Sequence, residues 1–221
     1  MAQSQSGIAN RALQLVGAGT IMNLTDNTPE ARECTRAYDS CRRAEMRKQV
    51  WNFAVVRASL APSSVKPLFD YAYQFPLPTD CLRIVLPNDP YLDWKIEGRK
   101  ILTNAILSPF GFSYAQTQTV LAIVPVPLTS TTTTPVQPGA ILNLTYVSDV
   151  QDPTLFDPLF CELLSASMAK AICERLTQSN QKKADAQAAY RDALDEAKHA
   201  DAIESLPVDA PDDDWWIART S

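Results

Sequence analysis

Residues 153–177 read PTLFDPLFCELLSASMAKAICERLT and contain the strongest helical signal in the chain. Positions with the i, i+3, i+4 spacing of one helix face continue there for several turns. They are Leu159, Phe160, Leu163, Leu164, Ser167, Met168, Ala171, Ile172, Arg175 and Leu176. A helix with such a long face must bury that face against neighbours, so we expect it to be the centre of the helical part of the fold.

Three other segments have helical patterns. Residues 4–17 place Ile8, Ala12, Leu15 and Val16 at helical spacing, and Gly17 can end that helix. Thr28-Pro29 is a start signal for a second helix, whose predicted buried stripe is Ala31, Cys34, Tyr38, Cys41 and Ala44. A fourth helix, about 180–204, carries the small-residue stripe Ala186, Ala189, Tyr190, Ala193, Ala197 and Ala200, which allows close packing.

Between Trp51 and Asp152 the apolar period changes from 3.6 toward 2, which indicates strands. The predicted strands are 52–60, 70–75, 81–86, 119–124 and 140–148, with a hairpin in DWKIEGRKILTN around Glu97-Gly98. Most of the sixteen prolines also fall in this part of the chain, so it is not continuous helix.

These patterns predict an α+β fold in which the N-terminal and C-terminal helices form a four-helix bundle with an inserted, antiparallel β-rich domain. The predicted parts are listed in chain order: residues 1–51, the first half of the bundle; 52–150, the β-rich domain with a threonine-rich loop at 126–139; 151–205, the second half of the bundle; and 206–221, an extended tail.

The composition excludes several classes of protein. No apolar run approaches the roughly 20 residues of a membrane helix, and the N-terminus lacks a secretory signal, so we expect folding in a cytoplasm and no membrane partner. Five cysteines without a CxxC pair predict buried thiols rather than a disulfide framework or a zinc site. The net charge of −5 disfavours general binding to nucleic acid.

The sequence offers few groups for catalysis. His199 is the only histidine, and it lies on the alanine-rich helix without an evident partner. Asp93 and Glu97 share one strand face, but four residues along a strand separate them by about 13 Å, farther than the carboxylate pairs of glycosidases. We therefore expect no catalytic residues, no metal and no cofactor, although carboxylates from different strands could still converge.

Two features are unusual for an ordinary surface. The polar face of the second helix carries Arg32, Arg36, Arg42, Arg43, Arg47 and Lys48. It is either a solvated face or an interface that pairs with acidic groups of a neighbouring subunit. The tail carries Trp215, Trp216 and Ile217 after a run of three aspartates, and exposed tryptophans are costly unless a partner or the chain's own domain buries them.

Several strings of the sequence resemble the tail tubular protein A family, the head-to-tail adaptors of short-tailed bacteriophages. They are NRALQLVGAGTIMNLTDNTPEARECTRAYDSCRRAEMRKQVWNFAVVRASLA, FDYAYQFPLPTDCLRI, WKIEGRKILTN, LTYVSDVQDPTLFDPLFCELLSASMAKAICERLT and EAKHADAIES. The most specific are WNFA, LPxDCLR and DPxLFDPLF, and the similarity runs in order from about residue 8 to 205. It does not cover the threonine-rich loop or the tail.

The resemblance implies a structural virion protein without enzymatic activity. Its subunits would form a ring, commonly of twelve copies, between the portal protein and the tail nozzle or tube protein, and the ring would enclose the channel through which DNA leaves. DNA would pass without specific binding, because an acidic lumen repels phosphates. The protein would be assembled in the host cytoplasm and reside in the neck of the virion.

Two site hypotheses follow from these features. Trp215, Trp216 and Ile217 would anchor the tail on the portal or on a neighbouring subunit, and Arg36, Arg43 and Arg47 would make ring or portal contacts. The alternative function is a tail-associated hydrolase that acts on envelope polysaccharide or peptidoglycan. Nonspecific DNA binding is a third reading, and the acidic total speaks against it everywhere except on the second helix.

Overall fold

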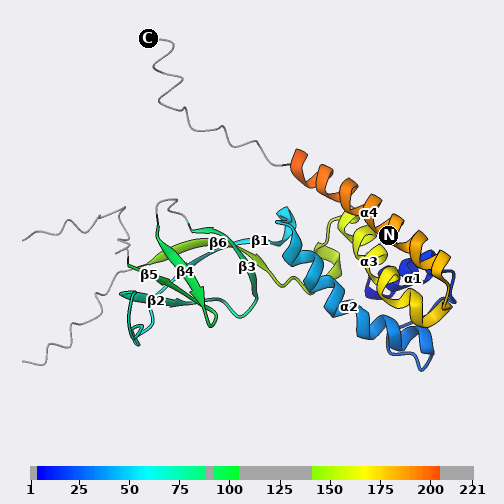
Figure 1. The fold of residues 1–221 in the computed structure, drawn as a ribbon, viewed down its shortest axis with the longest axis horizontal. Coiled ribbons are helices and arrows are strands. Elements are labelled where there is room, and N and C mark those ends of the chain that lie inside the picture. The colour runs from blue at the N-terminus through cyan, green and yellow to red at the C-terminus, as the bar shows by residue number, and fades with distance from the viewer. Residues whose placement is uncertain (1–3, 88–91, 105–140, 205–221) are drawn as a thin grey trace, which may run out of the picture. The chain divides into compact units, whose positions relative to one another are not determined.

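The computed structural model describes residues 4–87, 92–104 and 141–204. The chain divides into two compact units, a helical unit made of the segments up to Ala54 and from Val150 onward, and a β-rich unit of Val55–Asp149 (Figure 1). The described residues contain four α-helices and two small antiparallel sheets, so the predicted mixed α+β class is confirmed.

All four predicted helices are present in the helical unit. They are α1 (Gln5–Val16), α2 (Pro29–Lys48), α3 (Pro158–Thr177) and α4 (Asn180–Ile203). Their ends follow local capping chemistry. The Thr28 hydroxyl accepts a hydrogen bond from the Ala31 amide at 3.2 Å and begins α2, and Gly17 ends α1 with a left-handed φ of 78°. These two predicted helix ends are confirmed.

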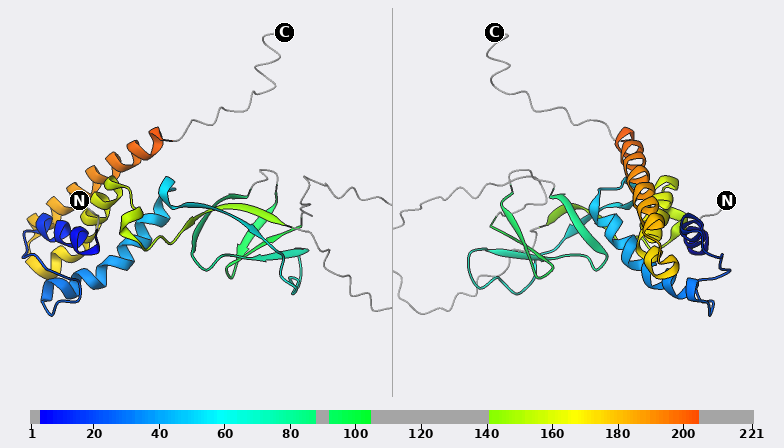
Figure 2. Two further views of the ribbon diagram at one scale, coloured as in Figure 1. Left: turned by 180° about the vertical axis from the view of Figure 1, so that it is seen from behind. Right: turned by 45° about the vertical axis from the view of Figure 1, so that its right-hand side comes forward.

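Helix α3 is the centre of the helical unit, as expected. Helices α1, α2 and α4 each pack along it and make few contacts with one another, and Figure 2 shows this arrangement from two further sides. Small residues such as Ala166 and Ala169 alternate with Leu163 and Met168, so the middle of α3 is buried on every side. The prediction of a single buried stripe was therefore too narrow. Ala171, which that stripe included, is exposed.

Helix α2 buries a set of residues that differs from the predicted stripe. Ala31, Cys34 and Tyr38 are buried as expected, but Ala44 is exposed and Arg42 is only 3% exposed. The assignment of Arg42 to the polar face was wrong. Its guanidinium lies at the edge of the buried face, where Nη1 donates a hydrogen bond to the backbone carbonyl of Val150, so the buried charge has a polar partner.

The β-rich unit holds two three-stranded antiparallel sheets. Their strands are β1 (Val55–Leu60), β2 (Tyr73–Pro76), β3 (Cys81–Pro87), β4 (Trp94–Glu97), β5 (Lys100–Thr103) and β6 (Leu142–Ser148). The strand orders are β1-β6-β3 and β2-β5-β4. The core of the unit contains Phe75, Cys81, Ile84, Leu92, Ile101, Leu142, Leu144 and Tyr146.

A tight turn at Gly98-Arg99 joins β4 to β5. Gly98 has a φ of 51°, which confirms the positive φ predicted there, and Arg99 also has a positive φ of 60°. Two consecutive left-handed residues are the signature of the type I′ hairpin turn. The Arg99 guanidinium donates hydrogen bonds to the carbonyls of Pro78 and Thr79, which offsets the strain of a left-handed arginine.

Three sequence predictions fall on residues that the structure does not describe. They are the strand at 119–124, the threonine-rich loop at 126–139 and the tail at 206–221. Among the residues that are described, none of the helices combines the length and the apolar character needed to cross a bilayer.

Candidate subunit interface on helix α2

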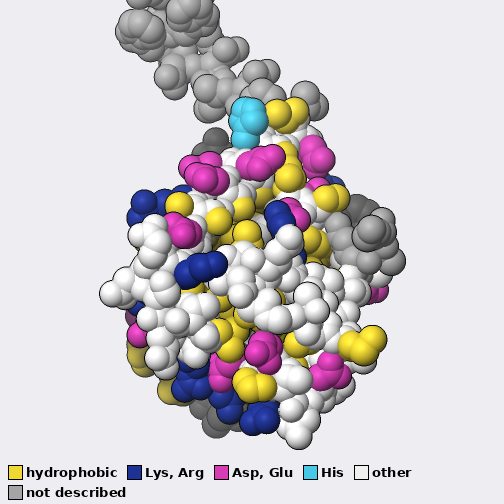
Figure 3. All heavy atoms as spheres, turned by 90° about the vertical axis from the view of Figure 1, so that its right-hand side faces the viewer, with side chains coloured by type: hydrophobic (Ala, Val, Ile, Leu, Met, Phe, Trp, Pro, Cys, Tyr) yellow, Lys and Arg dark blue, Asp and Glu magenta, His cyan; other side chains and the backbone are white. Residues whose placement is uncertain are grey.

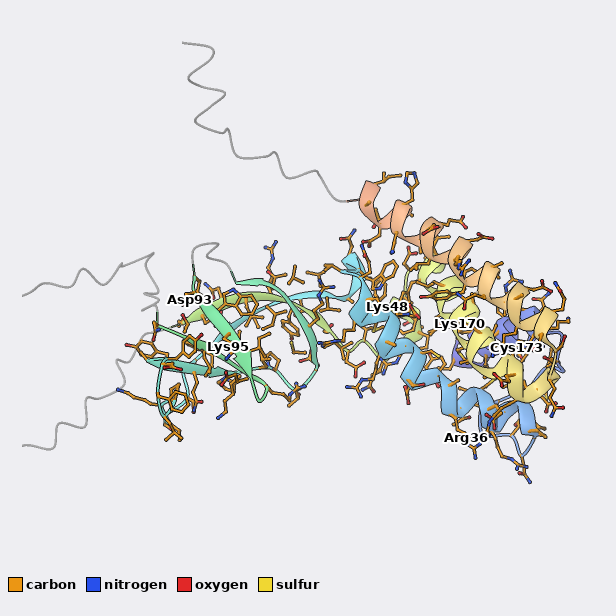
Figure 4. All side chains as sticks on the ribbon, in the orientation of Figure 1. Arg36, Lys48, Asp93, Lys95, Lys170 and Cys173 are labelled. Atoms are coloured by element: carbon orange, nitrogen blue, oxygen red, sulfur yellow. The ribbon has the colours of Figure 1, made fainter. Side chains whose placement is uncertain are left out.

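The predicted interface residues Arg36, Arg43 and Arg47 lie together on one exposed face of α2, which we call the arginine face. At 3.6 residues per turn their directions fall within about 40° of one another. This direction is opposite to the buried side that packs on α3. Figure 4 shows Arg36 on the outer side of the helix. The local spacing alone therefore places all three guanidinium groups at the surface.

One carboxylate organises the N-terminal end of this surface. Glu33 Oε1 accepts a bond from Arg36 Nη1 at 2.9 Å and another from Arg175 Nη1 of α3, also at 2.9 Å. Both arginine side chains remain 66% exposed. Exposed ion pairs of this kind contribute little to stability. Their effect is to extend positive charge from α2 onto α3, not to hold the two helices together.

A buried polar cluster holds α2 in place, and we define it as Glu45, Ser167 and Tyr190, with the half-exposed Lys48 at its edge. Glu45 is 1% exposed and accepts hydrogen bonds from Ser167 Oγ at 2.7 Å, Tyr190 OH at 3.2 Å and Lys48 Nζ at 2.7 Å. Because Ser167 lies on α3 and Tyr190 on α4, one carboxylate links three helices. The cluster fixes the axis of α2 and so the orientation of the arginine face.

Two lysines flank the Tyr190 ring of this cluster. Lys170 Nζ lies 4.0 Å from the ring centre and Lys48 Nζ lies 5.2 Å from it, which are cation–π distances, and Figure 4 labels both lysines. Burial lowers the pKa of Lys48, but its hydrogen bonds to Glu45 and Tyr190 outweigh burial and raise that pKa above its ordinary value. Lys48 therefore stays charged in the cluster.

Sequence reasoning missed Glu45, although a signal for it exists. Glu45 lies seven residues after Tyr38, at the heptad distance that returns to the same helix face, so it continues the buried stripe. It was not predicted to be buried, because charged side chains are usually exposed. A carboxylate is tolerated at such a position only where several donors converge, and those donors come from distant helices.

The groups considered for catalysis are not assembled into an acid–base pair within the described residues. Glu97 Oε1 forms an ion pair with Lys95 Nζ at 2.6 Å, and Asp93 and Glu97 are both exposed. His199 is exposed on α4. Burial raises the pKa of the Cys34 thiol to about 11 and that of Cys161 to about 12, so both thiols stay protonated and unreactive at neutral pH.

The last described residue, Glu204, lines a pocket of about 160 Å³ in the helical unit, where the tail begins. Such a volume accommodates about one aromatic ring. The lining residues are Trp51, Asn52, Phe53, Leu155, Phe156, Asp157, Ala197, Ala200, Asp201 and Glu204. Three carboxylates, those of Asp157, Asp201 and Glu204, make the lining of this pocket acidic. Desolvation and the charges of Glu204 and Asp157 raise the pKa of Asp201 and outweigh the hydrogen bond from the Asn52 amide, which lowers it.

The structure thus brings three of the six predicted interface residues onto one surface, and the other three, Trp215, Trp216 and Ile217, lie outside the described residues. The face of the molecule in Figure 3 instead mixes positive and negative side chains with apolar ones, as an ordinary protein surface does. No protein-family model matches this chain, and no curated protein matches its sequence.

Proposed function

We propose that this chain is a structural virion protein, a head-to-tail adaptor of a short-tailed bacteriophage. It would form a ring of twelve copies between the portal protein and the tail nozzle, around the channel through which DNA leaves. The sequence strings that resemble the tail tubular protein A family suggest this role. The observation that supports it most is the arginine face, which is exposed, rigidly oriented by the buried polar cluster and not needed for the packing of α2 on α3.

A closed ring requires two different and complementary surfaces on each subunit. In our proposal the four helices act as a bundle that forms the body of the ring, with the arginine face at a subunit or portal contact. The β-rich unit would dock the nozzle, and Trp215, Trp216 and Ile217 would anchor the tail on the portal or on a neighbouring subunit. No reaction, cofactor or metal is part of this mechanism.

The charge of the chain supports passage of DNA rather than binding. A ring of subunits that each carry a net charge of −5 would repel phosphates over most of its surface. DNA would therefore move through the channel without specific contacts. The proposed location is the neck of the virion, with assembly in the host cytoplasm.

Native mass spectrometry of the full chain, alone and mixed with the portal protein of the same phage, tests the proposal. We expect a dodecamer to form alone or on the portal. Reversing the charge of two proposed interface residues with R43E/R47E should weaken the assembly. Raising the salt concentration should also weaken the assembly of the wild type, because salt screens the charges. A chain that stays monomeric and does not bind the portal would exclude the adaptor role.

A matched control separates interface effects from a change in net charge. R191E/K198E changes the net charge of the chain by the same amount on exposed positions of α4 that lie away from the arginine face. We expect this variant to assemble like the wild type. Equal weakening by both variants would show that total charge, and not the arginine face, governs assembly.

A further inference from the structure

The β-rich unit carries an exposed apolar segment at residues 63–71, which we call the apolar loop. Leu68 is 96% exposed, Phe69 is 75% exposed and Val65 is 66% exposed. Phe69 is also the only exposed aromatic residue among those that the structure describes. Every other described aromatic side chain is buried or half-buried, so this exposure is exceptional in the fold. Exposed apolar side chains that gather in one place mark sites of protein contact.

Hydrogen bonds at both ends hold the apolar loop in one shape. The side chain of Gln74, which is buried in β2, donates to the carbonyl of Val65. At the other end, Asn104 donates to the carbonyl of Asp70 at 3.1 Å and accepts from the Ala72 amide at 2.8 Å. Because the loop is already ordered, it loses little conformational entropy when a partner binds it.

The apolar loop is too small to form an interface with a second identical loop. Its three exposed apolar side chains offer on the order of 400 Å². Each partner of a specific interface buries about 800 Å². The loop therefore acts as a protruding anchor, and anchors of this kind bind in pockets. Its partner surface must be concave and must accept an aromatic ring.

The helical unit has a pocket that meets both requirements, and we call it the aromatic pocket. It is the pocket of about 160 Å³ beside the C-terminal end of α4, and Trp51, Phe53 and Phe156 contribute its aromatic lining. A cavity of about 150 Å³ in a protein core holds one benzene ring. A phenylalanine ring therefore fits, whereas a tryptophan indole is larger. Leu155, which also lines the pocket, is 61% exposed and offers an apolar contact beside it.

Charge favours the apolar loop over the tail as the occupant of the aromatic pocket. Asp157, Asp201 and Glu204 line the pocket, and none of the described residues that line it is basic. This acidic lining repels the run of three aspartates in the tail. The chain carries a net charge of −5, but in residues 63–71 and 93–103 cations outnumber carboxylates by four to three. These are Lys66, Lys95, Arg99 and Lys100 against Asp70, Asp93 and Glu97.

We propose that Phe69 of one copy inserts into the aromatic pocket of the next copy. This inference rests on the proposed function, because it names one contact through which the copies assemble. The apolar loop and the aromatic pocket are different surfaces, so the contact can repeat from copy to copy around a ring. In this contact the Phe69 ring packs against the three aromatic residues, and Leu68 packs on Leu155.

Two variants test the contact from its two sides. Phe69→Ala removes the inserted ring, and Ala200→Phe fills the pocket from its own lining. We expect each to weaken assembly, alone or on the portal, at least about tenfold in native mass spectrometry, because an aromatic anchor dominates such a contact. Met22→Ala is the matched control, since Met22 is 86% exposed in the helical unit and does not line the pocket, and it should assemble like the wild type. Far-ultraviolet circular dichroism should show the same helical content for all three variants.

Cross-linking between separate chains shows whether the two surfaces meet. Leu68→Cys and Leu155→Cys are made in different chains, one of them labelled with heavy isotopes, and the mixture is treated with a short bismaleimide reagent. We expect a cross-linked pair with the mass of one chain of each kind, and adding Phe69→Ala to the Leu68→Cys chain should abolish it. The native cysteines are buried except the half-buried Cys41, so the wild type measures the background. An assembling mixture without the mixed pair would refute the contact.

The possible outcomes separate this inference from the proposed function. If Phe69→Ala assembles as well as the wild type, the contact is wrong and the adaptor role stands. Weakening by Ala200→Phe without weakening by Phe69→Ala would assign the aromatic pocket to another occupant, such as the tail. Normal self-assembly of Phe69→Ala with loss of nozzle binding would assign the apolar loop to the nozzle. Absence of any wild-type assembly, alone or on the portal, would overturn both proposals.

Discussion

Replacing Glu45 tests whether the buried polar cluster holds the helical unit together. Glu45→Ala removes the acceptor of two buried hydroxyls, Ser167 Oγ and Tyr190 OH, and removes the carboxylate partner of Lys48. A buried donor that loses its partner costs about 1–3 kcal/mol. Lys48 is half exposed and regains water, so its share is at most about 1 kcal/mol. The alanine variant also no longer buries a carboxylate, which is unfavourable by itself, and this offsets part of the cost.

We therefore expect Glu45→Ala to lower the free energy of unfolding by about 3 kcal/mol. Glu45→Gln keeps the side-chain stem and one acceptor oxygen, and we expect it to cost about 1 kcal/mol. A typical domain has a total stability of about 5–15 kcal/mol, so the alanine variant should unfold at a clearly lower denaturant concentration. The difference between the two variants isolates the hydrogen bonds from the packing of the stem.

Urea unfolding followed by far-ultraviolet circular dichroism is the suitable assay, because all described α-helices belong to the helical unit. A double-mutant cycle with Tyr190→Phe should give a coupling free energy of about 1 kcal/mol. Asp195→Ala, at an exposed position of α4, serves as the control and should change stability by less than about 0.5 kcal/mol. If Glu45→Ala and Glu45→Gln lowered the free energy of unfolding by the same small amount, with no coupling to Tyr190, the buried polar cluster would not stabilise the helical unit.

Three further predictions concern alkaline stability, the hairpin and the tail. Burial raises the pKa of Cys34 from 9.0 to about 11 and that of Cys161 to about 12, so the folded chain binds more protons than the unfolded chain in this range. Its unfolding free energy should therefore fall as pH rises above 9. Cys34→Ala should make this decrease smaller in urea titrations under reducing conditions. An unchanged dependence of the unfolding free energy on pH would contradict the raised pKa of Cys34. Gly98→Val places a β-branched residue at a φ of 51° and should lower the stability of the hairpin by about 1–2 kcal/mol. Hydrogen exchange in β4 and β5 should then be faster. Gly19→Ala is the control, because the added methyl group meets open space, and its stability should be unchanged. Deleting residues 207–221 should weaken co-assembly with the portal without changing the helical signal, and undiminished binding would exclude the tail as an anchor.

Structural features that depend on residues close together in the chain were predicted correctly. Thr28 caps α2 through the amide of Ala31, three positions away, and Gly17 and Gly98 take the left-handed conformations that their positions require. In each case the interacting atoms are neighbours along the chain. The backbone preference of one residue, or one capping hydrogen bond, is then enough to decide where a helix or strand ends.

The exposure of the arginine face was predicted correctly, and its role as an interface stays a prediction. The exposure of Arg36, Arg43 and Arg47 follows from their spacing opposite an apolar stripe. Arg42 was misplaced and Glu45 was overlooked, because the burial of a charged side chain depends on partners that the local sequence does not contain. Ser167 and Tyr190 lie 122 and 145 residues beyond Glu45 in the chain.

The sequence by itself determined the four helices, most of the strand positions, the tight turn at Gly98 and the spacing of charges along α2 and α4. Only the tertiary structure decided that the middle of α3 is buried on every side, that β6 pairs between β1 and β3, and that Glu45 is enclosed by three helices. The physical reason is that a local pattern sets the direction in which a side chain points. What that side chain meets there depends on which distant segments pack against it.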